Sequence, residues 1–389
     1  MIAHLDADSF FASVLVRQDP KLQGKPVFAL GMGGSCVIAA TYEAKAFGVK
    51  TGMRLAEARK LCPGAIERPC DFAETQVASQ QIESIVASVC PVYEQMSVDE
   101  WYMDLRTCLG GDPTQPKDWA TALRDRVKRE TALSVSVGVG PTKLLAKMAG
   151  EYRKPAGVTV IDPVIDMALE PFLRDRPAAA IPGIGRKRVQ ETDSRGWKTA
   201  WDFSQADPLL VQRLFGRGGL DLRAELKGNS VSAVTTDSGP PKSIQRARSF
   251  RGTNDRAAVW AYVLDHLAYT VLKMRRQELA CRGVTVWLRD GEYRGRGESL
   301  SAPQGLTNET QLLPLAKRCF DALWEPRQRY TQAGLGLWRL EPAGGQQFSL
   351  FAPPETLLKN DELQVAVDKL RERYGKDIIK RGAALRAGN

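Results

Sequence analysis

The sequence has only two histidines and no paired cysteine spacing, and these scarcities disfavour several kinds of catalytic centre. With His4 and His266 alone, neither a zinc site nor a histidine-based catalytic triad is expected. The seven cysteines show no spacing typical of metal ligands. Their odd number, without a secretion signal, fits the reducing environment of the cytoplasm, where we expect the protein to be located.

Long hydrophobic runs are missing as well. No apolar stretch approaches the roughly 20 residues that a membrane-spanning helix needs. Asp6 and Asp8 interrupt the only early apolar stretch, so no signal peptide is expected and no membrane partner. A chain of 389 residues with 43% hydrophobic and 26% charged residues is instead typical of a globular protein with several domains.

Two separated segments carry the most informative residues, which are carboxylates. Residues 2–8 read as a short buried strand containing Asp6 and Asp8, and residues 97–100 contain Asp99 and Glu100. Carboxylates held side by side in a core repel each other and need a compensating cation. Oxygen ligands suit Mg²⁺, and two such ions can hold the attacking and leaving oxygens of a phosphoryl transfer. The alternative is two unrelated pairs of surface acids.

The net charge of +10 is unevenly distributed. Residues 1–162 hold 19 Lys and Arg against 19 Asp and Glu, whereas residues 242–342 hold 17 against 10. Such an excess in one segment indicates a surface for a polyanion. A basic domain that is merely well solvated is the alternative.

The chain divides into four segments and a tail. Residues 1–162 alternate helices with apolar strands and predict an α/β fold; the strands are Val27–Leu30, Cys36–Ala40, Trp101–Leu105 and Leu133–Val139. A helix is expected over residues 41–50, closed by Gly48. Residues 163–233 read as helical, residues 229–241 have the composition of a linker, and a polar amphipathic helix is expected at about 360–375.

Residues 242–342 read as a β-α-β-β-α-β domain, with helices at 255–276 and 309–323 and one open sheet face. Basic residues on its strands would suit a phosphate backbone; those selected as DNA-binding candidates are Arg246, Arg248, Arg289, Arg294 and Arg296.

In the helical segment, residues 163–233, the turn containing Gly183 and Gly185 precedes Arg186 and Lys187. It can aim helix-start N–H groups and cations at a DNA phosphate.

Five motifs, in this order, resemble those of the Y family of translesion DNA polymerases. They are Asp6-Ala7-Asp8-Ser9-Phe10-Phe11-Ala12, Tyr42–Val49, Ser97–Asp104, Lys154-Pro155-Ala156-Gly157 and Pro182–Gly185. The resemblance covers nearly the whole chain and implies an α/β and α+β multidomain, right-hand polymerase. It implies a palm at 1–10 and 71–162, fingers at 11–70, a helical thumb at 163–233, a linker at 234–241, a little finger at 242–342 and a tail at 343–389.

The resemblance also implies roles for individual residues. Asp6, Asp99 and Glu100 would be catalytic and would bind two Mg²⁺ ions, with the Ala7 carbonyl as a further ligand. Phe11 would be the steric gate against ribonucleotides. The incoming triphosphate would be held by Tyr42, Lys45 and Lys154, whereas Asp8 corresponds to a position that is not a metal ligand.

The tail peptide Gln347-Phe348-Ser349-Leu350-Phe351 resembles the bacterial peptide that binds the ring-shaped sliding clamp. Gln347, Phe348, Leu350 and Phe351 would make that contact; packing on the protein's own domain is the alternative. The remaining partners implied are primer–template DNA and dNTP, with the protein a monomer in the cytoplasm, associated with the nucleoid.

Some positions depart from the family pattern and leave the subfamily open. Lys45 stands where many relatives have arginine, Ala39 replaces a hydroxyl residue, and Trp101 replaces a small residue. The stretch around Cys36–Lys45 resembles the polymerase V catalytic subunit, whereas the Lys-Pro-x-Gly motif and the chain length resemble polymerase IV.

The function implied is low-fidelity, template-directed addition of dNTPs to a primer 3′ end during translesion synthesis and DNA repair. The alternative is a non-catalytic Y-family scaffold that binds DNA and clamp; such scaffolds lack the acidic triad, which is complete here. A two-metal nuclease is disfavoured, because the steric-gate and triphosphate motifs would then have no purpose.

Overall fold

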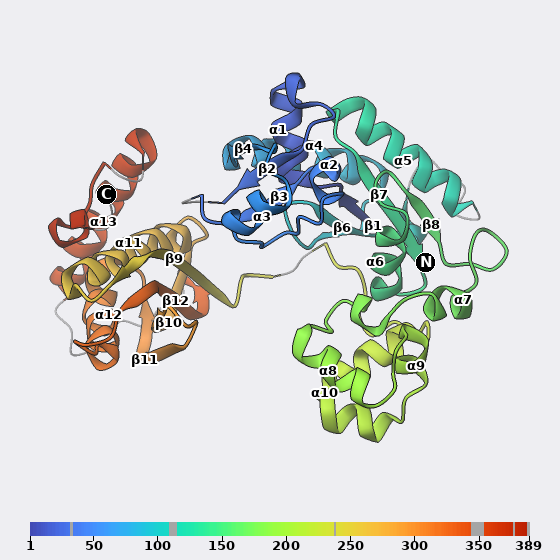
Figure 1. The fold of residues 1–389 in the computed structure, drawn as a ribbon. Coiled ribbons are helices and arrows are strands. Elements are labelled where there is room, and N and C mark those ends of the chain that lie inside the picture. The colour runs from blue at the N-terminus through green and yellow to red at the C-terminus, as the bar shows by residue number, and fades with distance from the viewer. Residues whose placement is uncertain (32–33, 109–114, 237–238, 344–353, 376–377, 387–389) are drawn as a thin grey trace. The chain divides into compact units, whose positions relative to one another are not determined.

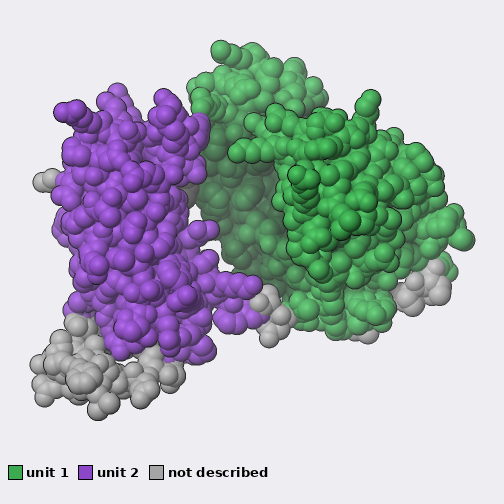
Figure 2. Space-filling model, turned by 90° about the horizontal axis from the view of Figure 1, so that it is seen from below, with its two compact units in different colours: residues 1–237 green, residues 238–389 purple. Residues whose placement is uncertain are grey.

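The computed structural model (Figure 1) describes the chain except residues 32–33, 109–114, 237–238, 344–353, 376–377 and 387–389. The chain forms two compact units, Met1–Asp237 and Ser238–Asn389, coloured separately in Figure 2. None of the helices in the described ranges is long and apolar enough to cross a membrane.

A five-stranded sheet lies at the centre of the first unit, in the order β5-β6-β1-β7-β8. The strands are β1 (Ile2–Ala7), β5 (Tyr93–Gln95), β6 (Glu100–Asp104), β7 (Val135–Gly140) and β8 (Val158–Val160). β1 pairs antiparallel with both β6 and β7, so the first carboxylate segment runs beside the second.

The two faces of this sheet differ in chemistry because side chains alternate along a strand. Apolar residues such as Leu5 and Met103 point to one face and form a core with α4 (Phe72–Val89) and α5 (Pro116–Thr131). His4, Asp6 and Glu100 point to the other face, which α6 (Lys143–Tyr152) covers. The polar residues of the site are thereby concentrated on the side of the sheet that α6 covers.

Two glycines allow α6 to lie close to the sheet. A Cβ atom on Gly138 of β7 would lie only 2.0 Å from the backbone nitrogen of Gly150 on α6. A Cβ atom on Gly150 would lie 3.2 Å from Nδ1 of His4. Larger side chains at either position would push the helix, and with it Lys147, away from the carboxylates.

A second, three-stranded sheet follows β1, in the order β3-β2-β4. Its elements are α1 (Phe10–Gln18), η1 (Pro20–Leu22), β2 (Val27–Leu30), β3 (Val37–Ala40), α2 (Tyr42–Lys45), α3 (Leu55–Leu61) and β4 (Ile66–Pro69). The helix expected over 41–50 is a single turn, which ends at Lys45. Gly48 takes the left-handed conformation expected after a helix end, with φ of 87°.

The remainder of the first unit is helical, as the sequence predicts. Its elements are α7 (Leu169–Arg174), η3 (Ala178–Ala180), α8 (Arg186–Ser194), α9 (Ala200–Gln205) and α10 (Pro208–Leu226). Phe203 and Phe215 pack edge to face in its core, with ring centroids 5.4 Å apart.

The second unit confirms the predicted β-α-β-β-α-β order. Its elements are β9 (Ser243–Thr253), α11 (Arg256–Arg275), β10 (Leu279–Asp290), β11 (Gly295–Leu306), α12 (Glu309–Leu323) and β12 (Tyr330–Pro342). The sheet order is β11-β10-β12-β9, and both helices pack on one face. Val286 and Leu288 point into this core, so their neighbours Trp287 and Arg289 lie on the open face.

The C-terminal elements α13 (Pro354–Tyr374) and η5 (Gly382–Arg386) pack on the second unit. Arg371 is buried and pairs with the buried Glu309 at 2.5 Å, and Arg381 contacts the same carboxylate at 3.2 Å. Arg275 of α11 pairs with Asp368 at 2.6 Å. The helix expected in the tail is therefore present and longer than predicted, and its second half is anchored to α11 and α12.

Candidate active site

The acidic residues singled out in the sequence converge at adjacent strands. Asp6 on β1 lies directly opposite Glu100 on β6 in the antiparallel pair. Asp99 immediately precedes β6, and its carbonyl accepts a hydrogen bond of 2.9 Å from the Ala7 N–H. Ser97 donates to the Asp99 carboxylate at 2.5 Å. Register thus places the carboxylates of Asp6 and Glu100 side by side, and the backbone hydrogen bond fixes Asp99 next to Ala7.

The electrostatics of this cluster favour a cation. Burial raises the pKa of Asp6 to about 7, although the ion pair with Lys154 opposes the shift; the charges of Asp99 and Glu100 raise it further. Ligand atoms of His4, Asp6 and Glu100 lie within 4.8 Å of one another. The two carboxylate oxygens of this group, from Asp6 and Glu100, suit a hard divalent ion such as Mg²⁺.

Two residues of this cluster were not identified from the sequence, namely Lys147 and His4. Lys147 of α6 forms an ion pair with Glu100, and the fully buried His4 places its Nε2 3.8 Å from the same carboxylate. Burial, and after it the charges of Lys147 and Lys154, lower the pKa of His4, so its ring is neutral. The only sequence signal for Lys147 was its i,i+4 spacing from Lys143, which places both lysines on one face of a helix. This spacing does not show which strand the helix covers.

The three residues predicted to hold a triphosphate lie around the same end of β1. Lys154 pairs with Asp6, and the Nζ of Lys45 donates to the Ser9 hydroxyl at 2.7 Å. The same Nζ lies 4.4 Å from the centroid of the Tyr42 ring. Burial and then Lys154 lower the pKa of Lys45, against the opposing charges of Asp8 and Asp6. Three groups from α2 and from the turn after α6 therefore border the acidic cluster.

Phe11 lies in the first turn of α1, four residues after β1 ends at Ala7. Its ring is half-buried and packs edge to face on Phe72, with centroids 6.0 Å apart. Ser9 starts the helix in the left-handed conformation, with φ of 50°. This turn and the contact with Phe72 fix the position of the Phe11 ring.

The glycine turn of the helical segment also has the predicted form. Gly183 has φ of 97°, a conformation that other residues avoid. Gly185 is the N-cap of α8, and no side chain caps that helix start. Arg186 and Lys187 follow on the exposed surface.

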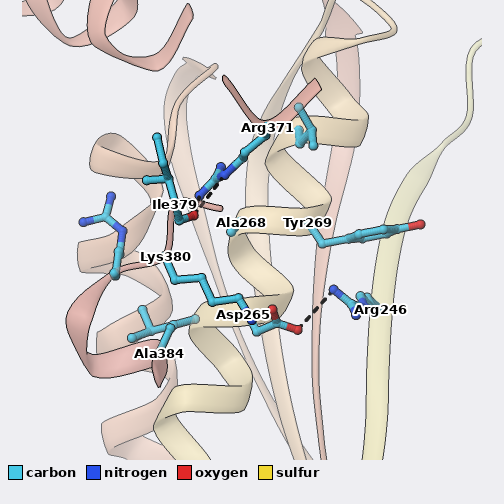
Figure 3. A pocket seen from close by; sticks show the side chains of 11 residues that line it. Arg246, Asp265, Ala268, Tyr269, Arg371, Ile379, Lys380 and Ala384 are labelled. Carbon is cyan, nitrogen blue, oxygen red and sulfur yellow. Dashed lines mark hydrogen bonds and ion pairs between the residues drawn. The ribbon is translucent and has the colours of Figure 1, made fainter. Parts of the chain in front are cut away.

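The five arginines proposed for DNA binding do not share one sheet face. Arg246 pairs with Asp265 of α11 at 3.2 Å and lies over the Tyr269 ring, as Figure 3 shows. Arg248 lies over the Tyr262 ring of the same helix. Both side chains therefore lie on the helical side of β9 and not on the open face of the sheet, and their role in DNA binding stays a prediction.

The other three arginines have different surroundings. Arg289 points to the open face of the sheet, by its place in the alternation of β10. Arg294 pairs with Asp290 at 3.1 Å, and Arg296 pairs with Glu325. The predicted clamp peptide, residues 347–351, lies outside the described residues.

Comparison with known proteins identifies the class. Residues 5–151 match the impB/mucB/samB family, and residues 241–350 match the C-terminal domain of that family. The DNA polymerase IV of Methanoculleus marisnigri is 35% identical over 76% of this chain and 81% of its own length. That of Stenotrophomonas maltophilia strain K279a is 32% identical over 88% of this chain and 94% of its own.

Solved structures share the fold. A Y-family DNA polymerase chimera of Dbh and Dpo4 matches with a TM-score of 0.74 and 22% identity, covering 87% of this chain and 98% of that one. An insertion ternary complex of Dbh DNA polymerase matches with a TM-score of 0.61 and 22% identity over the same shares.

The fold is that of the right-hand class of polymerases, and the sequence matches make the assignment specific. The chain belongs to the Y family of DNA polymerases. It is a DNA-directed DNA polymerase of translesion synthesis, and its relatives named here are DNA polymerase IV. Membership implies dependence on a divalent metal and binding of primer–template DNA and dNTP.

Proposed function

We propose that Asp6, Asp99 and Glu100 hold two Mg²⁺ ions at the primer 3′ end, with the Ala7 carbonyl as a further ligand. The observation that carries this proposal is that Asp6 and Glu100 lie opposite each other on one sheet face and that the charge of Asp99 acts on the same Asp6 carboxylate. Bound Mg²⁺ would neutralise the developing charge of the phosphoryl transfer. Chelation should therefore stop primer extension by the purified protein, and restored Mg²⁺ should recover it.

The residues bordering the carboxylates orient the nucleotide. Tyr42, Lys45 and Lys154 bind the triphosphate, and Phe11 excludes a ribose 2′-hydroxyl. Lys154 and Lys147 contact the carboxylates in the described structure, so each can exchange a carboxylate contact for a phosphate when substrate arrives. Lys45 acts as a point charge, without the bidentate grip of an arginine.

The domain assignment follows the resemblance: palm at 1–10 and 71–162, fingers at 11–70, thumb at 163–233, linker at 234–241, little finger at 242–342 and tail at 343–389. The thumb turn at Gly183 and Gly185, with Arg186 and Lys187, holds the DNA backbone. The basic little finger also holds the DNA backbone. The protein acts as a monomer in the cytoplasm, associated with the nucleoid.

DNA binding should weaken steeply with salt, and Arg289 should contribute to it. Replacing Arg289 with alanine is expected to make the slope of log K against log salt shallower by about one, because one phosphate contact releases about one counterion. Fluorescence anisotropy of primer–template DNA at several salt concentrations measures this slope.

The matched control is Arg256→Ala, which removes an arginine at the start of α11 that pairs with Asp321. This variant should retain the wild-type slope. Equal slopes for Arg289→Ala and the wild type would place the DNA on another surface.

We further propose that residues 347–351 bind a sliding clamp, by resemblance of the peptide alone. Phe348, Leu350 and Phe351 supply the apolar anchors, and Gln347 fixes the register. Tethering raises the effective concentration of the polymerase at the primer. Replacing Leu350 and Phe351 with alanine should abolish stimulation of long-product synthesis by a clamp and leave short extension without clamp intact.

The control is Leu363→Ala, at an exposed position of α13. It should behave as the wild type in both assays. If the double variant loses short extension as well, these residues belong to the folded domain and the tethering role is wrong.

A further inference from the structure

Asp8 is the most densely bonded carboxylate beside the site, although it was set aside as a position without a role in metal binding. It is 2% exposed, and its two oxygens accept four hydrogen bonds from three separate segments. Oδ1 accepts from the Ser136 hydroxyl at 2.8 Å and from the Tyr42 hydroxyl at 3.4 Å. Oδ2 accepts from the Ser134 hydroxyl at 2.7 Å and from the Ala156 N–H at 2.8 Å.

No lysine or arginine in the described part of the chain pairs with Asp8 at ion-pair distance. A buried carboxylate without such a partner is costly unless hydrogen bonds compensate for the lost water. Four donors fill the two oxygens and leave little capacity for a metal ion or a nucleotide. The carboxylate is therefore engaged in holding protein groups rather than substrate.

The groups that Asp8 holds are the ones that border the nucleotide site. Tyr42 belongs to the start of α2, and Ala156 belongs to the turn that also carries Lys154. Ala156 has φ of 55°, a left-handed conformation that is unfavourable for a non-glycine residue. Its N–H bond to Asp8 offsets that cost and fixes the turn. Such backbone outliers concentrate where function requires a set geometry.

We propose that Asp8 is a positioning residue that sets the Tyr42 hydroxyl and the Lys154 turn for the incoming triphosphate. It lies in the turn directly after β1, two residues after Asp6, so one short segment carries both a proposed metal-binding carboxylate and the anchor of the nucleotide-binding groups. This inference rests on the proposed roles of Tyr42 and Lys154. Ser134 and Ser136 on the neighbouring strand segment hold the carboxylate in place.

Asp8→Asn is the direct test, because the amide has the same shape but keeps only one acceptor oxygen, so in either orientation two of the four donors lose their carboxylate acceptor. We expect KM for dNTP to rise about 10- to 100-fold with a smaller change in kcat. The midpoint of the Mg²⁺ titration and the affinity for primer–template DNA should stay at wild-type values. A shift of the Mg²⁺ midpoint with unchanged KM would make Asp8 part of the metal site and overturn the inference.

The matched control is Thr159→Val, an isosteric change at a buried hydroxyl of β8. It should leave KM within about twofold of the wild type, since the buried Thr159 hydroxyl makes no hydrogen bond that the change would remove. A rise in KM equal to that of Asp8→Asn would mean that any polar change in this sheet has the effect, and the assignment to Asp8 would be wrong.

Reference variants separate this inference from the proposed function. Tyr42→Phe and Lys154→Ala should each raise KM for dNTP, and Asp8→Asn combined with Tyr42→Phe should fall short of the product of the single effects. If the references raise KM and Asp8→Asn does not, the positioning role is wrong and the proposed function stands. If the references leave KM unchanged, the nucleotide-binding roles fail, and the inference fails with them.

The thermal unfolding midpoint shows whether Asp8→Asn folds. If it does not fold, a second variant tests the proposal. The double change Ser134→Ala with Ser136→Ala leaves the carboxylate in place and removes two of its four donors. It should raise KM for dNTP by about 3- to 10-fold. Wild-type KM in a folded double variant would contradict the proposal.

Discussion

Replacing Asp99 with asparagine is expected to lower kcat/KM for Mg²⁺-dependent primer extension by roughly 10³-fold or more, because a charged ligand is lost from a shared two-metal site. The side chain keeps its shape, so the fold should tolerate the change. Asp6→Asn and Glu100→Gln should have effects of the same order. Single-nucleotide incorporation under pre-steady-state conditions measures the loss.

The control for this series is Asp118→Asn, which removes an exposed carboxylate in the first turn of α5. It should retain wild-type extension. Retention of more than a tenth of the activity by Asp99→Asn would show that the reaction does not depend on this carboxylate, and the assignment of the site would be wrong.

Replacing Phe11 with alanine should have the second largest effect, which is on selectivity rather than rate. Without the ring, a ribose 2′-hydroxyl meets no clash, and the ratio of kcat/KM for dNTP over rNTP should fall roughly 10²-fold. Incorporation of dNTP should change little, because Phe11 supplies no ligand to the metal ions. The ratio is measured with one template base and the matching dNTP and rNTP.

Phe47→Ala is the comparison for the gate, since this aromatic side chain is 56% exposed in the same domain. Phe72→Ala is informative as well, because Phe72 packs on the Phe11 ring. It should give a smaller fall in selectivity by loosening the gate. Unchanged selectivity in Phe11→Ala would place the discrimination at another residue.

The sequence predicted the local elements and the acidic cluster well because both depend on short-range patterns. Alternating apolar residues located β1 and β7, and the second unit follows its predicted order of strands and helices. Carboxylates in two buried strands indicated a shared cation site before any pairing was known. The helix over 41–50 was predicted too long, because local propensity does not show where tertiary contacts stop a helix.

What the sequence did not reveal depends on packing between distant elements. Lys147 contacts Glu100 only because Gly138 and Gly150 bring α6 onto the sheet. Trp101, a departure from the family pattern, is fully buried in the core on the face opposite Glu100, so it fills space and leaves the carboxylates clear. Arg246 was selected as a DNA contact by its position on β9, and the sequence did not show that it pairs with Asp265 of α11.

The central claim is template-directed DNA synthesis, and incorporation of single nucleotides opposite each of the four template bases tests it most directly. Purified protein, primed template, Mg²⁺ and one dNTP at a time are sufficient. We expect primers lengthened by one nucleotide, with the complementary dNTP favoured opposite each template base. Shortened primers would indicate a nuclease, and DNA binding without any extension would indicate a non-catalytic scaffold; either result would contradict the account.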